Sequence, residues 1–165
     1  MAVELGVQSF DDAQLTWMRR GHDREQSIKA IERIQKECPA VDLGIHLMFG
    51  WPNETHQDLI ETAKLCNELK IDNVKLHNLH ILKNTVLADL YAKGEFAPVE
   101  IEDYASRVAT FLSHLSPDIA IHRLAATASR WDELVAPAWT RNKMQNYQYM
   151  IKHLIDNNLS QGCAL

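Results

Sequence analysis

The amino-acid sequence predicts an α/β fold built on a mostly parallel sheet. Residues 2–9 and 71–82 alternate apolar and polar side chains, and residues 41–49 form a nearly continuous apolar run, so all three segments read as strands. Stretches with the helical spacing of apolar residues separate them. Strands that follow one another through helices pair in parallel, which indicates a parallel sheet.

The first helices follow from capping and helix-breaking residues. A short helix over residues 13–19 is expected to end at Gly21, and a second helix covers residues 24–37. Thr55 is the expected N-cap of the helix that runs through residues 55–69. Each helix therefore lies between two predicted strands, as a parallel sheet requires.

Beyond the third strand we expect helices over residues 85–91 and 98–115, then a strand over residues 118–124. Residues 125–140 show no clear pattern and read as an ordered surface loop. A last helix covers residues 141–157. Its predicted inner side carries Tyr147, Met150, Ile151, Leu154 and Ile155.

The most informative stretch is residues 41–55, VDLGIHLMFGWPNET, which predicts a strand covered on both faces, a loop and a helix start. Loops at the carboxyl ends of parallel strands are where ligands bind. Gly44, His46, Met48 and Gly50 share one strand face. If this face lines a barrel, the glycines leave room for a flat ligand and His46 supplies a hydrogen bond. The alternative is that His46 is a satisfied core histidine.

Composition bounds the class of protein. The 165 residues suggest one domain, with 46% apolar and 24% charged residues, as in ordinary globular proteins. The net charge of -5 indicates no nucleic-acid surface. No apolar run approaches the roughly 18 residues that span a membrane, and no signal sequence is visible, so we expect a cytoplasmic protein.

The cysteines predict neither a disulfide framework nor a metal site. The three residues Cys38, Cys66 and Cys163 are widely spaced, no CxxC or CxxxCxxC occurs, and Cys66 reads as a small core residue. His77 and His80 are three positions apart on a predicted strand, which places them on opposite faces and makes them a poor metal pair. We therefore expect no metal site in this chain.

Several motifs in one order resemble the second half of the radical S-adenosylmethionine (SAM) enzyme core: ELGVQS at residues 4–9, RGH at residues 20–22 and HLMFGWPNET at residues 46–55. The later stretches KLHNLHILKNTVLADLYAKGEF, IHRLAA and LVAPAW are similar to the YhcC-like radical SAM group. The resemblance implies the C-terminal part of a (β/α) TIM-type barrel plus C-terminal helices. Residues 1–125 would be the second half of the barrel, and residues 126–165 a loop and helix extension on the same domain.

In that family a 4Fe-4S iron-sulfur cluster, held by CxxxCxxC after the first strand, reduces SAM to a 5'-deoxyadenosyl radical. This chain lacks the cysteine motif, which on the family's plan lies upstream of Met1. The resemblance therefore implies a fragment of an enzyme that acts on an unknown substrate. It would supply part of the SAM site, ligate no cluster, be inactive alone and require the missing N-terminal half of the barrel as its partner.

The resemblance also assigns roles by position. Gln8 corresponds to a contact with the SAM ribose, and His46 lies where relatives place another polar ribose contact. Arg20 falls where relatives hold the methionyl carboxylate, unless it is a solvated helix-end charge. Residues 49–52 correspond to the segment that packs against adenine. The predicted cofactor-binding residues are Gln8, Arg20, His46, Phe49, Gly50 and Pro52.

Four further residues are candidates for facing the substrate: Glu4, Lys75, His77 and Arg123. Glu4 shares a strand face with Gln8 and is a suitable partner for Lys75, a pair that is more often structural than catalytic. The family pattern identifies no catalytic residue among them.

Two other functions compete with this one. The radical SAM domain of elongator-type tRNA-modifying acetyltransferases shares ELGVQS and the RGH step, although the chain lacks a basic surface for tRNA. A non-catalytic module is the second alternative, in which a half barrel pairs with another half or forms a homodimer through its exposed sheet edges.

Overall fold

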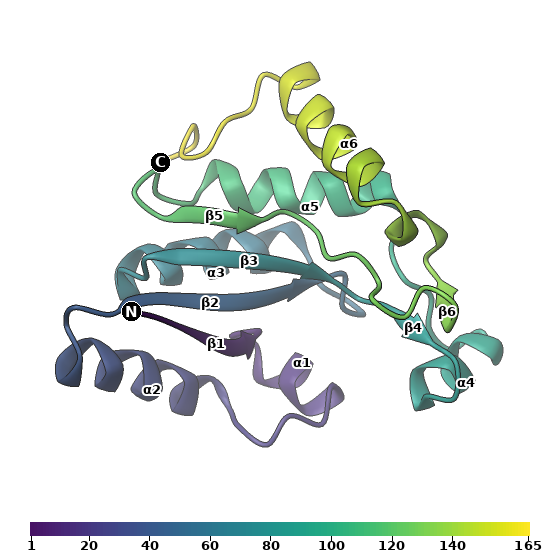
Figure 1. Ribbon diagram of the computed structural model, residues 1–165, viewed down its shortest axis with the longest axis horizontal. Helices are drawn as coiled ribbons and strands as arrows, with labels where there is room; N and C mark the ends of the chain where they lie inside the picture. Colours follow the sequence, from purple (N-terminus) through teal and green to yellow (C-terminus); the bar gives the residue numbers. More distant parts are fainter.

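The computed structural model describes residues 1–165 and confirms the α/β fold (Figure 1). Four parallel strands form one sheet in the order β1-β2-β3-β5. Their bounds are Ala2–Gln8 for β1, Asp42–Phe49 for β2, Asn73–Asn78 for β3 and Ala120–Arg123 for β5. β1 and β5 lie at the two edges of the sheet, so neither has a partner on its outer side.

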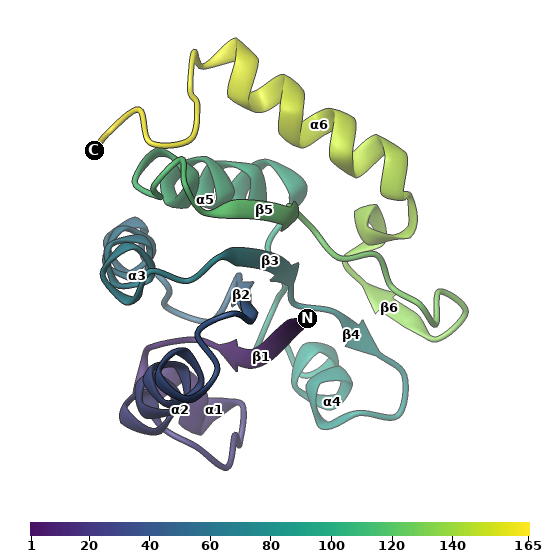
Figure 2. The ribbon, with the colours of Figure 1, turned by 60° about the vertical axis from the view of Figure 1, so that its left-hand side comes forward.

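The helices lie mainly on one side of this sheet, while the opposite side is largely open (Figure 2). The helices on the covered side are α1 (Asp12–Trp17), α2 (Arg24–Glu37), α3 (His56–Leu69) and α5 (Ile101–Ser113). Across from them lies the short helix α4 (Val86–Ala92), and α6 (Lys143–Asp156) packs against α5. This is the arrangement of part of a (β/α) barrel, with helices outside and an inner strand face.

The core lies between the sheet and the covering helices. Ile45, Leu47 and Phe49 of β2 are at most 2% exposed, and the Phe49 ring packs against Phe111 of α5 with centroids 5.2 Å apart. On the other face of β2 the His46 side chain remains 32% exposed. The prediction that β2 is covered on both faces is therefore wrong for the middle of the strand, whereas Met48 near its end packs against a small apolar cluster that residues of α4 also contact.

Local signals account for the helix starts. Asp23 and Thr55 cap α2 and α3, each within a reciprocal capping box. The terminal helix buries fewer of its apolar residues than expected. Met150 is 1% exposed, whereas Tyr147 and Ile155, predicted on the inner side, are 55% and 71% exposed. No helix combines the length and apolarity that crossing a membrane requires.

The third predicted strand divides in two. β3 ends at Asn78, and residues Ile81–Leu82 form β4, which pairs antiparallel with β6 (Leu134–Ala136) in a separate sheet. Asn78 is fully buried, and its side-chain oxygen accepts a hydrogen bond from the Ala126 backbone N–H at 3.0 Å. Residues 125–140, which had no clear assignment, thus contain β6 and a 3-10 helix, η1 (Ala138–Arg141).

The break after Asn78 overturns one prediction. His77 and His80 do not point to opposite sides, because their ring centroids lie 5.1 Å apart. Strand alternation stops applying once the chain leaves the strand. The two imidazoles therefore share one site beside the open face of the sheet.

Candidate functional site

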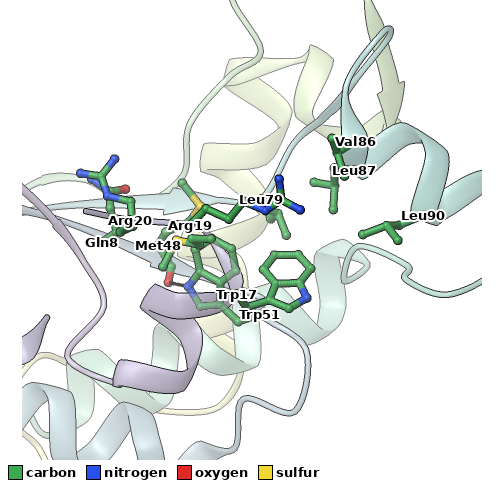
Figure 3. A pocket seen from close by; sticks show the side chains of 11 residues that line it. Gln8, Trp17, Arg19, Arg20, Met48, Trp51, Leu79, Val86, Leu87 and Leu90 are labelled. Carbon is green, nitrogen blue, oxygen red and sulfur yellow. Dashed lines mark hydrogen bonds between the residues drawn. The ribbon is translucent and has the colours of Figure 1, made fainter. Parts of the chain in front are cut away.

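A cavity of about 500 Å3 lies beyond the carboxyl ends of β1 and β2 (Figure 3). Its volume is in the range of small-molecule sites. Gln8 and Arg20 lie together at one end, and side chains of α4 lie at the other. The surface from the middle of the cavity to the α4 end is largely apolar and includes Trp17, Met48, Trp51, Leu79, Leu87 and Leu90. The cavity thus combines a polar end with an apolar surface.

The polar end brings two of the predicted cofactor residues together. Gln8 ends β1 with a positive φ of 69°, and a Cβ atom placed on Gly6 would lie only 3.0 Å from its Nε2. Arg20 donates from Nη2 to the carbonyl oxygen of Gly6 at 2.9 Å. Arg20 is exposed but anchored, and none of the ion pairs in the chain includes it. Its other N–H groups have no partner within the chain.

The sequence indicated only one part of the apolar wall, the segment 49–52 that contains Trp51, and did not indicate Trp17 or the residues of α4. Trp51 donates from Nε1 to the carbonyl oxygen of Met48 at 2.6 Å, which fixes its indole over the end of β2. Trp17 meets Trp51 edge to face, with ring centroids 5.5 Å apart. The available sequence signal was the tryptophan in the GWPNE segment, because it lies in a predicted ligand-binding loop. In the structure Trp51 is 4% exposed.

Of residues 49–52, only Trp51 presents its side chain to this cavity. The Phe49 ring is buried in the main core, so any ligand contact at Phe49 would involve its backbone. Pro52 is half-buried and lines a neighbouring depression that it shares with Trp17 and Trp51. The roles carried over for Phe49, Gly50 and Pro52 stay predictions.

A buried ion pair shapes the loop between β2 and α3. The Glu54 carboxylate accepts from the Gly50 N–H at 2.7 Å and from Arg107 Nη1 at 3.0 Å. Burial raises the pKa of Glu54 to about 7, although the Gly50 N–H and the Arg107 guanidinium oppose this shift. Gly50 has a φ of 94°, and a Cβ there would lie 2.9 Å from Val99. The space beside Gly50 is thus filled by Val99 and does not admit a flat ligand.

Three polar side chains meet on the open face of the sheet. His46 Nε2 lies 3.0 Å from one Glu4 carboxylate oxygen, and Lys75 forms an ion pair with the other. These hydrogen bonds, first from Lys75 and then from His46, lower the pKa of Glu4 to about 2. The predicted pairing of Glu4 with Lys75 is confirmed, and His46 is not a core histidine. The gap beside Gly44 is occupied by the Asn73 side chain, so no flat ligand fits there.

His77 and Arg123 continue this face toward the other edge of the sheet. His77 lies opposite Met48 in the strand register, and its Nδ1 is 2.6 Å from the Asn78 carbonyl oxygen. Burial lowers the pKa of His77, and it lowers that of His80 to about 4. Both imidazoles are thereby kept neutral near pH 7. Arg123 is half-buried and donates from Nε to the Leu76 carbonyl oxygen at 3.1 Å.

The cysteines do not fit an iron-sulfur cluster. Cys66 is fully buried, and burial raises its thiol pKa. Cys38 follows α2 and Cys163 lies near the C-terminus, both exposed. No three His, Cys, Asp or Glu residues are grouped so that they would hold a metal ion. A cluster needs several thiolates around one centre, and this chain does not provide them.

A parallel sheet with helices on one side and a cavity at the strands' carboxyl ends defines a TIM-barrel-like α/β protein. The chain belongs to the radical SAM superfamily: the profile described as Radical SAM superfamily matches residues 2–66, and the Radical_SAM C-terminal domain matches residues 71–156. The predicted resemblance is thereby confirmed.

Similar proteins agree with this assignment. Uncharacterized protein MJ0486 of Methanocaldococcus jannaschii is 33% identical over 160 residues, which cover 97% of this chain and 49% of that protein. Protein YhcC of Escherichia coli K12 is 31% identical over 167 residues, which cover 99% and 52%. The chain thus spans about half the length of these relatives. The archaeal Methanocaldococcus infernus Elp3 with an N-terminus deletion (1-46) superimposes with a TM-score of 0.83 at 22% identity, over 98% of this chain and 37% of that one. It supports the fold.

Proposed function

We propose that this chain forms the C-terminal part of the catalytic barrel of a radical SAM enzyme and binds part of the SAM molecule. The observation that carries the proposal is the cavity beyond β1 and β2, which has the Gln8 amide and the Arg20 guanidinium at one end and an indole-lined apolar wall beside them. In this role the chain binds and orients the cofactor. The cluster is held by another segment.

The cavity suits the chemical groups of SAM. The Gln8 amide both donates and accepts hydrogen bonds, which matches the vicinal hydroxyls of a ribose. The unpartnered N–H groups of Arg20 match a carboxylate. Trp51 and Met48 offer an apolar and aromatic surface to a purine. When bound and reduced at the cluster, SAM supplies the oxidising radical that starts the family's chemistry.

The substrate side of the barrel is assigned to the open sheet face beside this cavity. Glu4 and Lys75 hold each other and His46 in place there. His77 and Arg123 lie further along the same face and have donors or acceptors that no other side chain of the protein uses. We expect these two residues to contact the substrate, with the Glu4–Lys75 pair acting as their support.

Binding of SAM to the 165-residue chain tests the proposal. In calorimetric titrations Gln8→Ala and Arg20→Gln should each weaken SAM binding roughly tenfold, because each removes hydrogen bonds to a polar or charged ligand group. Arg33→Gln, on the exposed side of α2, is the matched control and should leave the affinity unchanged. A folded chain that shows no SAM binding would leave the non-catalytic module as the better account.

We further propose that the free edge of β1 is completed by another strand, from the other half of the barrel or from a second copy of this chain. β1 pairs only with β2, and unpaired strand edges invite association. Light scattering should show a dimer or larger species at high concentration. A monodisperse monomer there would contradict this proposal.

A tRNA-modifying role is the alternative, supported by the fold that the chain shares with Elp3. Against it stands the net charge of -5, since tRNA binding depends on a basic surface. An electrophoretic mobility assay with total tRNA separates the two. Salt-sensitive retention of tRNA by the chain would favour the tRNA-modifying role. If no tRNA is retained even at low salt, the result favours the first proposal.

A further inference from the structure

Arg123 carries a charge that the chain does not balance. It is half-buried at the end of β5, and only its Nε has a partner, the Leu76 carbonyl oxygen at 3.1 Å. None of the eight ion pairs in the chain includes it. Partly buried cations are ordinarily paired with an anion, because desolvation without a partner is costly. The guanidinium therefore has two NH2 groups available for an acceptor from outside the chain.

The cavity next to Arg123 contains only neutral and basic groups. It has a volume of about 250 Å3 and lies between β5 and the first turns of α6, which begins near the carboxyl end of β5 (Figure 2). Its polar lining consists of His122, Arg123, Thr127, Lys143, Asn146 and Tyr147, with no Asp or Glu. Lys143 forms no ion pair either. The N-terminal end of α6 adds its partial positive charge.

Asn146 supplies an independent observation. Its side chain lines the same cavity, the residue is only 4% exposed, and its Nδ2 has no hydrogen-bond partner. A buried amide donor without an acceptor costs free energy, and native structures leave few of them. The Nδ2 atom is shielded from solvent, so it lies within the wall of the cavity and not at its open surface. An acceptor in the cavity would pair with the free groups of Arg123 and Lys143.

We propose that the cavity between β5 and α6 is an oxyanion site, which binds a carboxylate or phosphate group of the substrate. This inference rests on the proposed function, because the bound group belongs to the substrate of that enzyme. It adds that the substrate is acidic. The volume is slightly below that of sites for whole drug-sized ligands, so it accommodates one anionic group with a few waters. Arg123 pairs with Lys75 in the register of β3 and β5, so the rest of the ligand would extend over the open sheet face toward Lys75 and His77.

The test is an NMR titration of the 15N-labelled full chain, first with inorganic phosphate and then with acetate, at constant ionic strength. Saturable chemical-shift changes should appear at the amides of residues 122–127 and 143–147 with at least one of the two anions. The anion that binds more tightly identifies whether the site prefers a phosphate or a carboxylate group. Lys143→Gln should raise the dissociation constant roughly tenfold. Asn146→Asp should abolish binding, because it places a carboxylate in the cavity with almost no change in shape.

Two controls match these variants in charge. Lys64→Gln removes an exposed lysine of α3, and Gln145→Glu adds a negative charge to the same turn of α6 outside the cavity. Both should bind the anion as the wild type does. No saturable shift with either anion, or equal binding by Asn146→Asp and wild type, would overturn the inference. SAM binding measured in the same samples reports separately on Gln8 and Arg20, so a chain that binds SAM but neither anion refutes only the oxyanion site.

Discussion

Arg20 donates from Nη2 to the backbone carbonyl oxygen of Gly6 at 2.9 Å. This hydrogen bond ties the segment after α1 to the edge strand β1, at the point where β1 delivers Gln8 to the cavity. Gly6 allows the approach because it has no side chain, and the Gln8 amide lies over the same position. The Gly6 carbonyl thus holds Arg20 directly, while the absence of a side chain at Gly6 leaves room for the Gln8 amide beside it.

Gly6→Ala should therefore impair the cavity without unfolding the protein. The new Cβ would lie 3.0 Å from Gln8 Nε2, so the Gln8 amide has to shift by a few tenths of an ångström, whereas its 3.6 Å distance to Arg20 Nη2 is an ordinary van der Waals contact. We expect SAM binding to weaken roughly two- to tenfold, which corresponds to one impaired hydrogen bond. Gly21→Ala is the control, because nothing lies within 4 Å of its added Cβ. Calorimetry would contradict the proposed site if both variants bound SAM equally well.

Glu54 should make the stability of the protein depend on pH. Its pKa is raised from 4.5 to about 7, so the folded chain binds more protons than the unfolded chain between these values. The free energy of unfolding should then fall as the pH rises from about 4.5 to 7, by at most about 3 kcal/mol. Urea unfolding across this pH range measures the change.

Glu54→Gln should flatten this dependence, because glutamine still accepts the Gly50 N–H but does not titrate. Glu61→Gln, on the exposed side of α3, is the control and should retain the wild-type slope. The opposite result is a wild type whose free energy of unfolding rises between pH 5 and pH 7 while that of Glu54→Gln stays constant. It would show that the Arg107 ion pair affects the pKa of Glu54 more than burial does.

The sequence predicted those parts of the fold that depend on neighbouring residues. β2 and α3 are marked by an apolar run, by Gly50 and by the Thr55–Asp58 capping box, all within about twenty residues. The end of β3 was missed because it depends on a hydrogen bond between Asn78 and the Ala126 backbone, 48 residues apart. Periodicity carries no information about such a contact.

The same distinction applies to the site. The resemblance to radical SAM enzymes predicted that Gln8, at the end of β1, and Arg20, after α1, contact one ligand, and the structure brings both to one end of a cavity. Trp51 lies inside the segment 49–52 that the resemblance relates to adenine packing, but its contact with Trp17 was not predicted, because this contact joins α1 to a loop more than thirty residues later. The Glu54–Arg107 pair escaped notice for the same reason, since the two residues are 53 positions apart.

Lys75→Met should release the Glu4 carboxylate from its strongest partner. The Lys75 hydrogen bond is the first cause of the low pKa of Glu4, and the His46 bond is the second. NMR titration of the side-chain carboxyl should place the wild-type pKa near 2 and the variant's clearly higher, still below 4.5 because His46 remains. Lys64→Met is the control. An unchanged pKa of Glu4 would mean that the ion pair does not persist in solution.

Iron and sulfide should not assemble into a cluster on this chain. Cys66 lies in the hydrophobic core with a raised thiol pKa, so it offers no thiolate, and Cys38 and Cys163 follow different helices. Anaerobic reconstitution should leave the purified chain without iron-sulfur absorbance, and a variant with Cys38→Ser and Cys163→Ser should behave like the wild type. If the wild-type chain bound stoichiometric iron and sulfide and the double variant did not, the prediction would be refuted. Their absence, together with SAM binding that requires Gln8, would divide the two halves of the chemistry: this chain positions the cofactor, and another segment holds the cluster.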